Sequence, residues 1–316
     1  MRAPVLFLTY NRATNASRVL EAIRIAQPRK LYFASNAATQ DAEGFQRVRQ
    51  VRDLTKTVDW ECELRTLFHP KHLDVKDSIT TSISWFFENE EEGIILEDDC
   101  VPSPDFWGFC DELLEKYRDD HRIAAIAGNG RQNTEFSREY PYSYYFSSFV
   151  HIWGWATWRR TWEHYSVDIP FWQDWKRSRD WRTRFSRGIE RKYWEQKFDG
   201  VYSGEINTWD YQMLLAAWRM DMLSIVPSVN LVSNEGFGVT AANTRDLDSP
   251  FAFQETQSIL PLTHPEIVER HADADRYDFE FGFGGRKRRI TIRVVEGFRR
   301  KLFDPIYRLI YRRFPG

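Results

Sequence analysis

The chain has 316 residues, of which 42% are hydrophobic and 16% aromatic, and its formal net charge is −2. This composition excludes a largely disordered chain and suits one large core, or one core with an appendage. The small net charge gives no reason to expect a nucleic-acid partner, and three cysteines without metal-ligand spacing predict neither a disulfide framework nor a zinc cluster.

The start of the chain and its hydropathy bear on where the protein resides. Residues 4–10 form the run Pro-Val-Leu-Phe-Leu-Thr-Tyr, without the charged and long apolar segments of a secretory signal ahead of it. No stretch of the sequence reaches the roughly 18 apolar residues that a transmembrane helix needs. We therefore expect a cytoplasmic protein that does not span the membrane.

Strand and helix patterns alternate over the first part of the chain. Short apolar runs predict strands at Val5–Leu8, Lys30–Ala34, Cys62–Phe68, Gly93–Leu96 and Ile123–Ala127. Apolar residues at helical spacing predict a helix that ends at Pro28, a second through Ile79, Ile83, Phe86 and Phe87, and a third after Pro104. The alternation predicts an α/β, Rossmann-like fold with a mostly parallel sheet, helices on both faces, and ligands bound at the carboxyl ends of the strands.

Residues 140–194 are dense in Tyr, Phe and Trp, with Arg between them. Three interpretations stay open: the rings form core, they stack on sugar rings in a cleft, or they bind single-stranded nucleic acid. We favour them in that order. Farther along, the pattern predicts a helix from about Thr208, a strand at Ile225–Leu231 and a glycine-containing loop at Ser233–Gly238.

The most informative motif is Glu97-Asp98-Asp99, three consecutive carboxylates at the end of the apolar run Gly93–Leu96. Neighbouring carboxylates repel one another, so a fold that gathers them at a strand end usually needs a cation there. Their hard oxygen atoms suit Mn²⁺ or Mg²⁺, and these ions in turn hold phosphates. The alternative is a solvated acidic turn.

A second group of polar residues follows the first predicted strand. Thr9, Tyr10, Asn11 and Arg12 offer backbone amides, a hydroxyl group, an aromatic ring and a guanidinium group to a nucleotide. The acidic motif is expected at the same edge of a parallel sheet. The two groups together predict a site for a nucleoside diphosphate whose phosphates reach a metal ion.

If a nucleoside diphosphate is the leaving group of a sugar transfer, a general base must deprotonate the acceptor hydroxyl. We predict that this base is Asp210, which lies between Trp209 and Tyr211 at the start of a predicted helix. The alternative is that Asp210 only complements the dipole of that helix.

Five segments together resemble bacterial GT-A nucleotide-sugar glycosyltransferases, distantly similar to N-acetylglucosaminyltransferase I. They are residues 4–12, 92–102, 151–160 (which include Trp-Gly-Trp-Ala-Thr-Trp), 209–212 and 230–238. The resemblance covers about residues 3–245. It implies a GT-A fold, a metal ion bound mainly through Asp99 of a Glu-Asp-Asp version of the DxD motif, and inversion at the anomeric carbon by a single displacement.

The resemblance also implies roles for further residues. Nucleotide-sugar binding falls to Thr9, Tyr10, Asn11, Arg12, Asn36, Lys76, Glu97 and Asp98, and the donor or acceptor cleft to His151, Trp153, Gly154, Trp155, Asn234 and Gly236. For Lys76 the alternative is a solvated lysine at a helix start, and for each tryptophan it is a place in the core.

Two features depart from the family pattern. Asn36-Ala37 stands where family members often carry Asp-Gly, so a carboxylate that would bind uracil or ribose is missing and the donor base stays open. The general base is also ambiguous, because Trp172-Gln173-Asp174-Trp175 resembles the Trp-Asp-Asp-Trp string of N-acetylglucosaminyltransferase I. Asp174 is therefore the alternative to Asp210.

We expect a GT-A domain at residues 1–245, with a nucleotide-sugar half at 1–100 and an acceptor half at 101–245, followed by a linker at 246–285 and a basic amphipathic helical tail at 286–316. From Arg286 to Arg313 the tail holds eleven Lys and Arg against two acids, a net charge of +9, which leaves −11 for the rest. Either the tail lies on anionic lipid at the inner face of the cell membrane, or it packs on the acidic body.

The sequence thus predicts an inverting, metal-dependent glycosyltransferase that moves a sugar from a nucleoside-diphosphate donor to a glycan or lipid-linked glycan in cell-surface glycan synthesis. One alternative is a non-catalytic glycan-binding module on the same scaffold, against which the intact acids and Asp210 argue. Another is a nucleotidyltransferase, which would more often carry a glycine-rich phosphate loop after the first strand; none is present.

Overall fold

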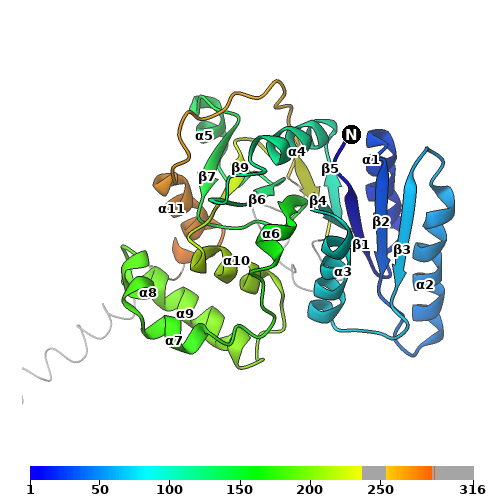
Figure 1. Ribbon diagram of the computed structural model, residues 1–316, viewed down its shortest axis with the longest axis horizontal. Helices are drawn as coiled ribbons and strands as arrows, with labels where there is room; N and C mark the ends of the chain where they lie inside the picture. Colours follow the sequence, from blue (N-terminus) through cyan, green and yellow to red (C-terminus); the bar gives the residue numbers. More distant parts are fainter. Residues whose placement is uncertain (237–253, 287, 289–316) are drawn as a thin grey trace, which may run out of the picture.

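The computed structural model describes residues 1–236, 254–286 and 288. Within them an eight-stranded sheet runs through the molecule in the order β3-β2-β1-β4-β8-β6-β9-β7 (Figure 1). Its strands are β1 (Val5–Thr9), β2 (Lys30–Ser35), β3 (Glu63–Phe68), β4 (Glu92–Glu97), β6 (Ile123–Ala127), β7 (Tyr144–Ser147), β8 (Trp155–Trp158) and β9 (Leu223–Pro227). A separate ladder pairs β5 (Cys100–Pro102) with β10 (Val232–Asn234).

Most strands of the large sheet run parallel. β3, β2, β1 and β4 are parallel neighbours, and β6 and β9 run in the same direction, whereas β8 and β7 are antiparallel. The predicted α/β fold with a mostly parallel sheet is confirmed. The sequence did not predict β8, because all its residues are buried and it shows no alternation of polar and apolar side chains.

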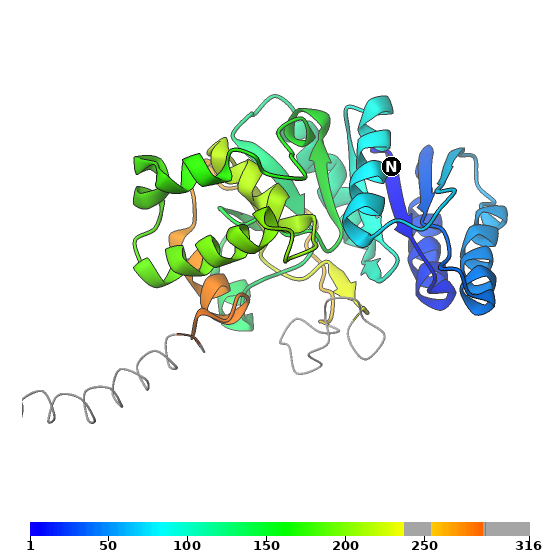
Figure 2. The same cartoon turned by 90° about the horizontal axis from the view of Figure 1, so that it is seen from below.

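Helices cover both faces of this sheet (Figures 1 and 2). Side chains of α1, α2 and α4 pack on one face and those of α3, α6 and α10 on the other. The helices described are α1 (Ala13–Ala26), α2 (Ala42–Asp53), α3 (Val75–Asn89), α4 (Pro104–Lys116), α5 (Thr134–Glu139), α6 (Arg159–Trp162), α7 (Trp172–Arg177), α8 (Arg179–Arg184), α9 (Gly188–Tyr202), α10 (Asp210–Arg219) and α11 (Ala272–Phe281). A short 3-10 helix, Leu54–Thr57, follows α2.

The first strand and helix show how the pattern becomes structure. Val5 and Phe7 pack with α1, while Leu6 and Leu8 pack with α3, because alternate residues of a strand point to opposite faces. Every residue of β1 is buried, as expected for a central parallel strand. The helix ends at Gln27, in the left-handed conformation, just before Pro28, whose ring cannot continue it.

The aromatic-rich stretch is mainly hydrophobic core. Trp172, Trp181 and Trp194 are fully buried and pack with α10. The indole N–H groups of Trp172 and Trp181 donate to Asp199 at 2.9 Å and to Glu195 at 3.1 Å, so these buried polar atoms are satisfied. The rings therefore hold α7, α8 and α9 against the rest of the fold.

The predicted linker at 246–285 is wrong where the structure describes it. Helix α11 lies within it, and the side chains of Asp275 and Asp278 on this helix are buried. These two acids on its inner face break the apolar periodicity, which is why the sequence pattern did not reveal the helix. Apart from residues 286 and 288, the predicted tail lies outside the described residues.

Two further observations concern surfaces. Across the part of the chain that the structure describes, every helix is too short or too polar to cross a membrane.

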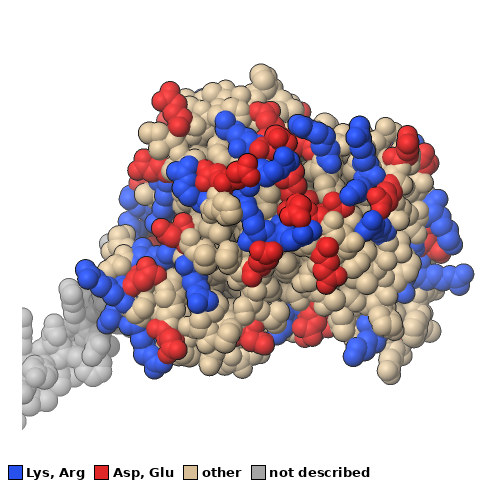
Figure 3. Space-filling view, in the orientation of Figure 1, with Lys and Arg blue, Asp and Glu red and all other residues tan. Residues whose placement is uncertain are grey.

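On the face shown in Figure 3, Lys and Arg side chains are interspersed with Asp and Glu. The acidic excess of the body therefore does not form a single patch on that face.

Candidate active site

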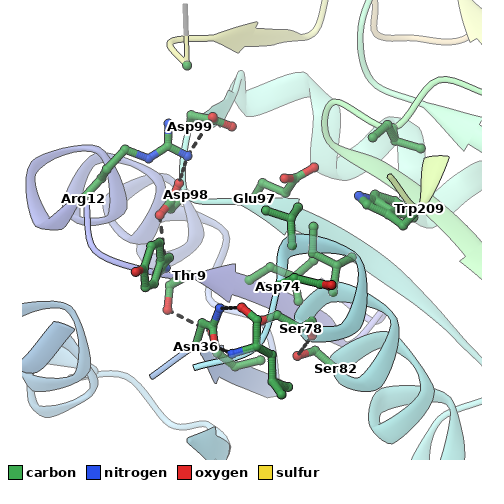
Figure 4. A pocket seen from close by; sticks show the side chains of 18 of the residues that line it. Thr9, Arg12, Asn36, Asp74, Ser78, Ser82, Glu97, Asp98, Asp99 and Trp209 are labelled. Atoms are coloured by element: carbon green, nitrogen blue, oxygen red, sulfur yellow. Dashed lines mark hydrogen bonds and ion pairs between the residues drawn. The ribbon is translucent and has the colours of Figure 1, made fainter. Parts of the chain in front are cut away.

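A cavity of about 630 Å³ opens where the carboxyl ends of β1, β2 and β4 meet (Figure 4). Parallel strands bring residues far apart in the sequence to this one edge. Of the residues predicted from the sequence, the cavity wall includes Thr9, Tyr10, Asn11, Arg12, Asn36, Glu97, Asp98, Asp99, Trp153, Asp210, Asn234 and Gly236.

The guanidinium group of Arg12 bridges two of the three acids (Figure 4). Its Nη2 lies 2.9 Å from Oδ2 of Asp99 and also binds Oδ1 of Asp98. The other Asp98 oxygen accepts the N–H of Tyr10 at 3.2 Å. Arg12 directly precedes α1, and the acids follow β4, so these contacts tie two strand ends together. Both carboxylate oxygens of Asp98 are thereby engaged.

Burial disfavours the charged forms of these acids. It raises the pKa of Glu97 well above its ordinary value, reinforced by the charges of Asp99 and Asp98. For Asp98, burial outweighs the pairing with Arg12 and raises the pKa to about 6. Additional positive charge at this position would favour the ionised forms.

The acid turn, Glu97-Asp98-Asp99, offers the kind of ligand atoms that a divalent cation needs. Carboxylate oxygens are the ligands that Mn²⁺ and Mg²⁺ prefer. The described residues contain no group of three or more His, Cys, Asp or Glu arranged to hold a metal ion. Both oxygens of Asp98 are engaged and Oδ2 of Asp99 pairs with Arg12, so within this turn Glu97 and the other oxygen of Asp99 would hold one, together with a ligand's phosphates. A Cβ on Gly236 would come within 2.0 Å of Oδ2 of Asp99, so this glycine leaves room beside the carboxylate.

The end of the cavity near β2 has a different character. The Asn36 side chain donates to the carbonyl of Leu73 at 2.8 Å and accepts the N–H groups of Ala37 at 2.8 Å and Leu73 at 3.1 Å. Its amide thus braces the loop before α3. The rings of Tyr10 and His72 lie 5.4 Å apart, tilted by 37°, in the same wall. Planar rings and polar groups at this end suit a heterocyclic base.

Asp210 lines the cavity as the first residue of α10. The Thr208 hydroxyl and the Tyr211 N–H, the latter at 2.9 Å, both donate to its Oδ1. Burial raises the pKa of Asp210 above its ordinary value. A carboxylate whose pKa is moved toward neutrality is a better proton acceptor, provided that it stays ionised.

The loop between β7 and β8 brings Trp153 to the cavity. Gly154, which follows it, has a φ of 63°, and a Cβ there would come within 2.8 Å of Val232. Its carbonyl accepts the N–H of Gly128 at 2.7 Å. Gly154 does not line the cavity; it provides the left-handed turn that a side chain would strain.

Besides Gly154, three other residues predicted for nucleotide-sugar binding or for the cleft do not line the cavity. Lys76 lies in the first turn of α3. His151 is buried, with Nε2 2.9 Å from Oδ2 of Asp278. Trp155 is a buried β8 residue whose ring packs 5.9 Å from that of Trp209. Burial in the core takes His151 and Trp155 away from direct contact with a ligand.

The two candidate bases occupy different surroundings. Asp174 lies in α7 with 91% of its side chain exposed, is paired with Arg177, and does not line the cavity. An exposed surface carboxylate has no reacting group within reach. Of the two candidates, Asp210 is the one at the cavity.

The start of α3 contributes to the cavity and was not predicted from the sequence. The cavity is also lined there by His72, Leu73, Asp74, Val75, Ser78 and Ser82, and near α10 by Asn207 and Thr208. Asp74 is the N-cap of α3 and accepts the N–H of Asp77 at 2.8 Å. An acidic N-cap after a parallel strand was the available signal, because that helix start faces the same sheet edge.

No protein-family model and no curated protein matches this chain. Among solved structures, a mannosyltransferase, PcManGT from Pyrobaculum calidifontis in complex with GDP-Man and Mn²⁺, is 14% identical over 70% of each chain, with a TM-score of 0.39. Mouse xyloside xylosyltransferase 1 is 10% identical over 84% of this chain and 98% of its own (TM-score 0.39). A UDP-glucose pyrophosphorylase complexed with UDP-glucose is 10% identical over 52% and 79% (TM-score 0.33). Similarity at this level does not identify a substrate.

Proposed function

We propose that this protein is an inverting GT-A glycosyltransferase that moves a sugar from a nucleoside-diphosphate donor to a hydroxyl acceptor, with Mn²⁺ or Mg²⁺. One observation carries the proposal: a single cavity at the strand ends holds the acid turn paired with Arg12 and also the buried carboxylate of Asp210. These are the parts that a transfer from a diphosphate needs, a phosphate-holding group and a proton acceptor.

The residues divide the work as follows. Arg12 holds the diphosphate, and the wall near Asn36 receives the nucleoside. A divalent ion held by Asp99 and Glu97 would neutralise the charge that develops on the leaving diphosphate. Asp210 takes the proton of the acceptor hydroxyl as its oxygen attacks the anomeric carbon from the face opposite the diphosphate, which inverts that carbon.

The acceptor and the setting are part of the same proposal. A glycan or lipid-linked glycan in cell-surface glycan synthesis is the acceptor we propose, in the cytoplasm, with the basic segment 286–316 on anionic lipid at the inner membrane face. A nucleotidyltransferase is the less favoured alternative, because the connection between β1 and α1, Tyr10-Asn11-Arg12, contains no glycine to wrap a triphosphate.

A ligand screen by thermal shift tests the proposal. We expect one nucleoside diphosphate and its sugar conjugates to raise the melting temperature, more so with Mn²⁺, since a ligand at 100 times its Kd adds about 2.7 kcal/mol of stability. NMR of the product then reports whether the anomeric carbon inverts. Stabilisation by glycans without any nucleotide would instead indicate a binding module, and pyrophosphate release from a nucleoside triphosphate and a sugar phosphate would indicate a nucleotidyltransferase.

A further inference from the structure

The chain contains a buried ionic cluster next to the cavity that the proposed chemistry does not use. It consists of Arg131, His151 and Asp278, with 6%, 7% and 2% of their side chains exposed. Taking charges out of water is costly, so such a group persists only where its members are closely paired. Asp278 comes from α11, more than a hundred residues beyond the other two.

Asp278 binds its two partners with different oxygens. Oδ1 accepts the Nε of Arg131 at 3.0 Å and lies 2.9 Å from Nη2, while Oδ2 lies 2.9 Å from Nε2 of His151. Arg131 follows the carboxyl end of β6, and His151 lies in the loop between β7 and β8. A single carboxylate thus joins two loops at the edge of the sheet.

Both partners of Asp278 adjoin Trp153, which lines the cavity. His151 is two residues before it, and the guanidinium carbon of Arg131 lies 5.7 Å from the centre of the Trp153 ring. This distance and the planar cation suit a cation–π contact. Asp278 also orients Arg131 through its hydrogen bond and ion pair. The orientation of the Trp153 ring therefore depends on where α11 places Asp278.

The position of Gly154 indicates which part of the cavity Trp153 reaches. Trp155 pairs with Ile95 in antiparallel β8 and β4, and a Cβ on Gly154 would come within 3.3 Å of the Leu96 side chain, so the chain just before β8 lies against the end of β4, where Glu97 lines the cavity. In Figure 4, Glu97 lies between the acid pair and Trp209, away from Asn36. The ring of Trp153 therefore stands at the end of the cavity where the sugar, and not the nucleoside, would lie.

We infer that Asp278 and Arg131 are positioning residues for the donor sugar, because together they hold the Trp153 ring as a wall of the sugar subsite. This inference rests on the proposed function for the identity of the ligand. The inference makes α11 part of the domain that holds the sugar subsite. Without Asp278, the Arg131 guanidinium group that faces the Trp153 ring loses its orientation.

The same helix offers a matched control. Asp275 is also buried, one helical turn earlier, and accepts hydrogen bonds from the Ser147 hydroxyl at 2.5 Å and from the N–H and hydroxyl of Ser148 at 3.1 and 2.6 Å. None of these three residues lines the cavity. Asp275 also pairs with Arg270. Asp275→Asn therefore removes a buried carboxylate charge from the same helix without removing a contact of Arg131 or Trp153.

The first experiment measures ligand affinity by calorimetry in the full chain for Asp278→Asn, Asp275→Asn, Trp153→Phe and the double variant Asp278→Asn/Trp153→Phe. We expect Asp278→Asn to weaken nucleotide-sugar binding about 5- to 10-fold relative to Asp275→Asn, with nucleoside-diphosphate binding unchanged, and the double variant to be no weaker than Trp153→Phe. Additive losses, or equal losses in both aspartate variants, would overturn the inference.

A second measurement is independent of any ligand. The fluorescence of each protein minus that of the same protein carrying Trp153→Phe gives the signal of Trp153 alone. We expect Asp278→Asn, but not Asp275→Asn, to increase the quenching of this signal by acrylamide. An unchanged Trp153 signal would contradict the inference even if the enzyme is active. A changed signal in a protein that binds no nucleotide sugar would instead remove the proposed function and leave the positioning of Trp153 intact.

If Asp278→Asn does not fold, Arg131→Lys serves the same test. Lysine keeps the charge opposite Asp278 but lacks the planar guanidinium that faces the Trp153 ring. We expect the same selective loss of nucleotide-sugar affinity and the same increase in Trp153 quenching. Wild-type values for both would contradict the inference.

Discussion

The two halves of the sheet contribute to the cavity in different ways. In residues 1–100, the polar residues that directly end β1, β2 and β4 line the wall. In residues 101–236 the wall is made by the loop around Trp153, by residues 207–210 at the start of α10, and by Asn234 and Gly236 at the end of β10, while most of the aromatic side chains there are core. The comparison teaches that the carboxyl end of a buried parallel strand is a strong signal for a site, whereas aromatic richness alone is not.

The largest expected effect is that of a substitution at Asp210, in the half of the sheet that follows residue 100. Asp210→Asn should lower kcat by about 10²-fold or more, as expected when a general base is lost, while nucleoside-diphosphate affinity stays unchanged. Steady-state kinetics and calorimetry on the same preparation measure both. The matched control is Asp174→Asn, which should behave as wild type because Asp174 is exposed. If Asp174→Asn loses turnover instead, the base has been assigned to the wrong carboxylate.

The next effect tests the first half. Asp99→Ala should weaken nucleotide-sugar binding and lower turnover together, because a charged partner worth about 1.5–3 kcal/mol is removed, roughly 10- to 100-fold in affinity. Calorimetry with and without Mn²⁺ is the measurement, and Glu61→Ala, at an exposed residue outside the cavity, is the control. A metal-dependent affinity that survives Asp99→Ala would show that this turn does not hold the ion.

A substitution at Gly154 tests whether the loop between β7 and β8 needs a left-handed turn. Gly154→Ala places a Cβ against Val232 at a φ of 63°, and strain of this kind costs about 1–3 kcal/mol. Thermal denaturation should show a lower melting temperature, by roughly 2–4 °C per kcal/mol. Gly188→Ala, where a Cβ would meet open space, should leave it unchanged or raise it. Equal melting temperatures for the two variants would mean that the turn tolerates a side chain.

The ionic cluster predicts a pH dependence of stability. Burial lowers the pKa of His151 below 6.5, and although burial alone would raise the pKa of Asp278, the charge of Arg131 holds it below its ordinary value. Both lowered values mean that these two groups bind more protons in the unfolded chain, so the contribution of the cluster to stability is fully present above about pH 6.5 and falls on acidification. The negative charge of Asp275 also acts on His151 and opposes the lowering of its pKa.

Melting temperatures of wild type and His151→Gln between pH 7.5 and 5 measure this effect, the pH range being set around the ordinary pKa of about 6.5 for histidine. We expect the wild type to lose more stability on acidification than His151→Gln. Other groups set the pH dependence that remains in the variant: burial lowers the pKa of His69, which costs stability on acidification, and raises the pKa of Asp98, which acts in the opposite direction. Identical pH profiles would show that His151 is not kept neutral in the fold.

The smallest effect on the folded unit concerns the basic segment. A chain truncated after Gly285 should remain folded and active on a soluble acceptor but lose sedimentation with anionic liposomes, and full-length binding should weaken with salt. Liposome sedimentation and thermal denaturation measure both. A lower melting temperature of the truncated chain would indicate that the segment packs on the body instead, and full-length protein that ignores anionic liposomes at low salt would remove the membrane proposal.

Several features of the site were predictable from the chain alone. The apolar run of β4 followed by Glu97, Asp98 and Asp99 predicted both the strand and the position of the acids, because local pattern and parallel-strand geometry suffice for that. The helix start at Asp210 was predictable for the same reason. The pairing of Arg12 with the acids was not, since it depends on where β1 and β4 lie relative to each other.

The sequence by itself determined the alternation of strands and helices, the central apolar strands and the polar residues at their ends, because hydrophobic periodicity is a local property of the chain. Tertiary structure alone decided that His151 and Trp155 are buried, that Asn36 braces a loop, and that Asp278 of α11 pairs with Arg131 and His151. Each of those outcomes depends on contacts between residues distant in sequence, and no local pattern records which partner a side chain will meet.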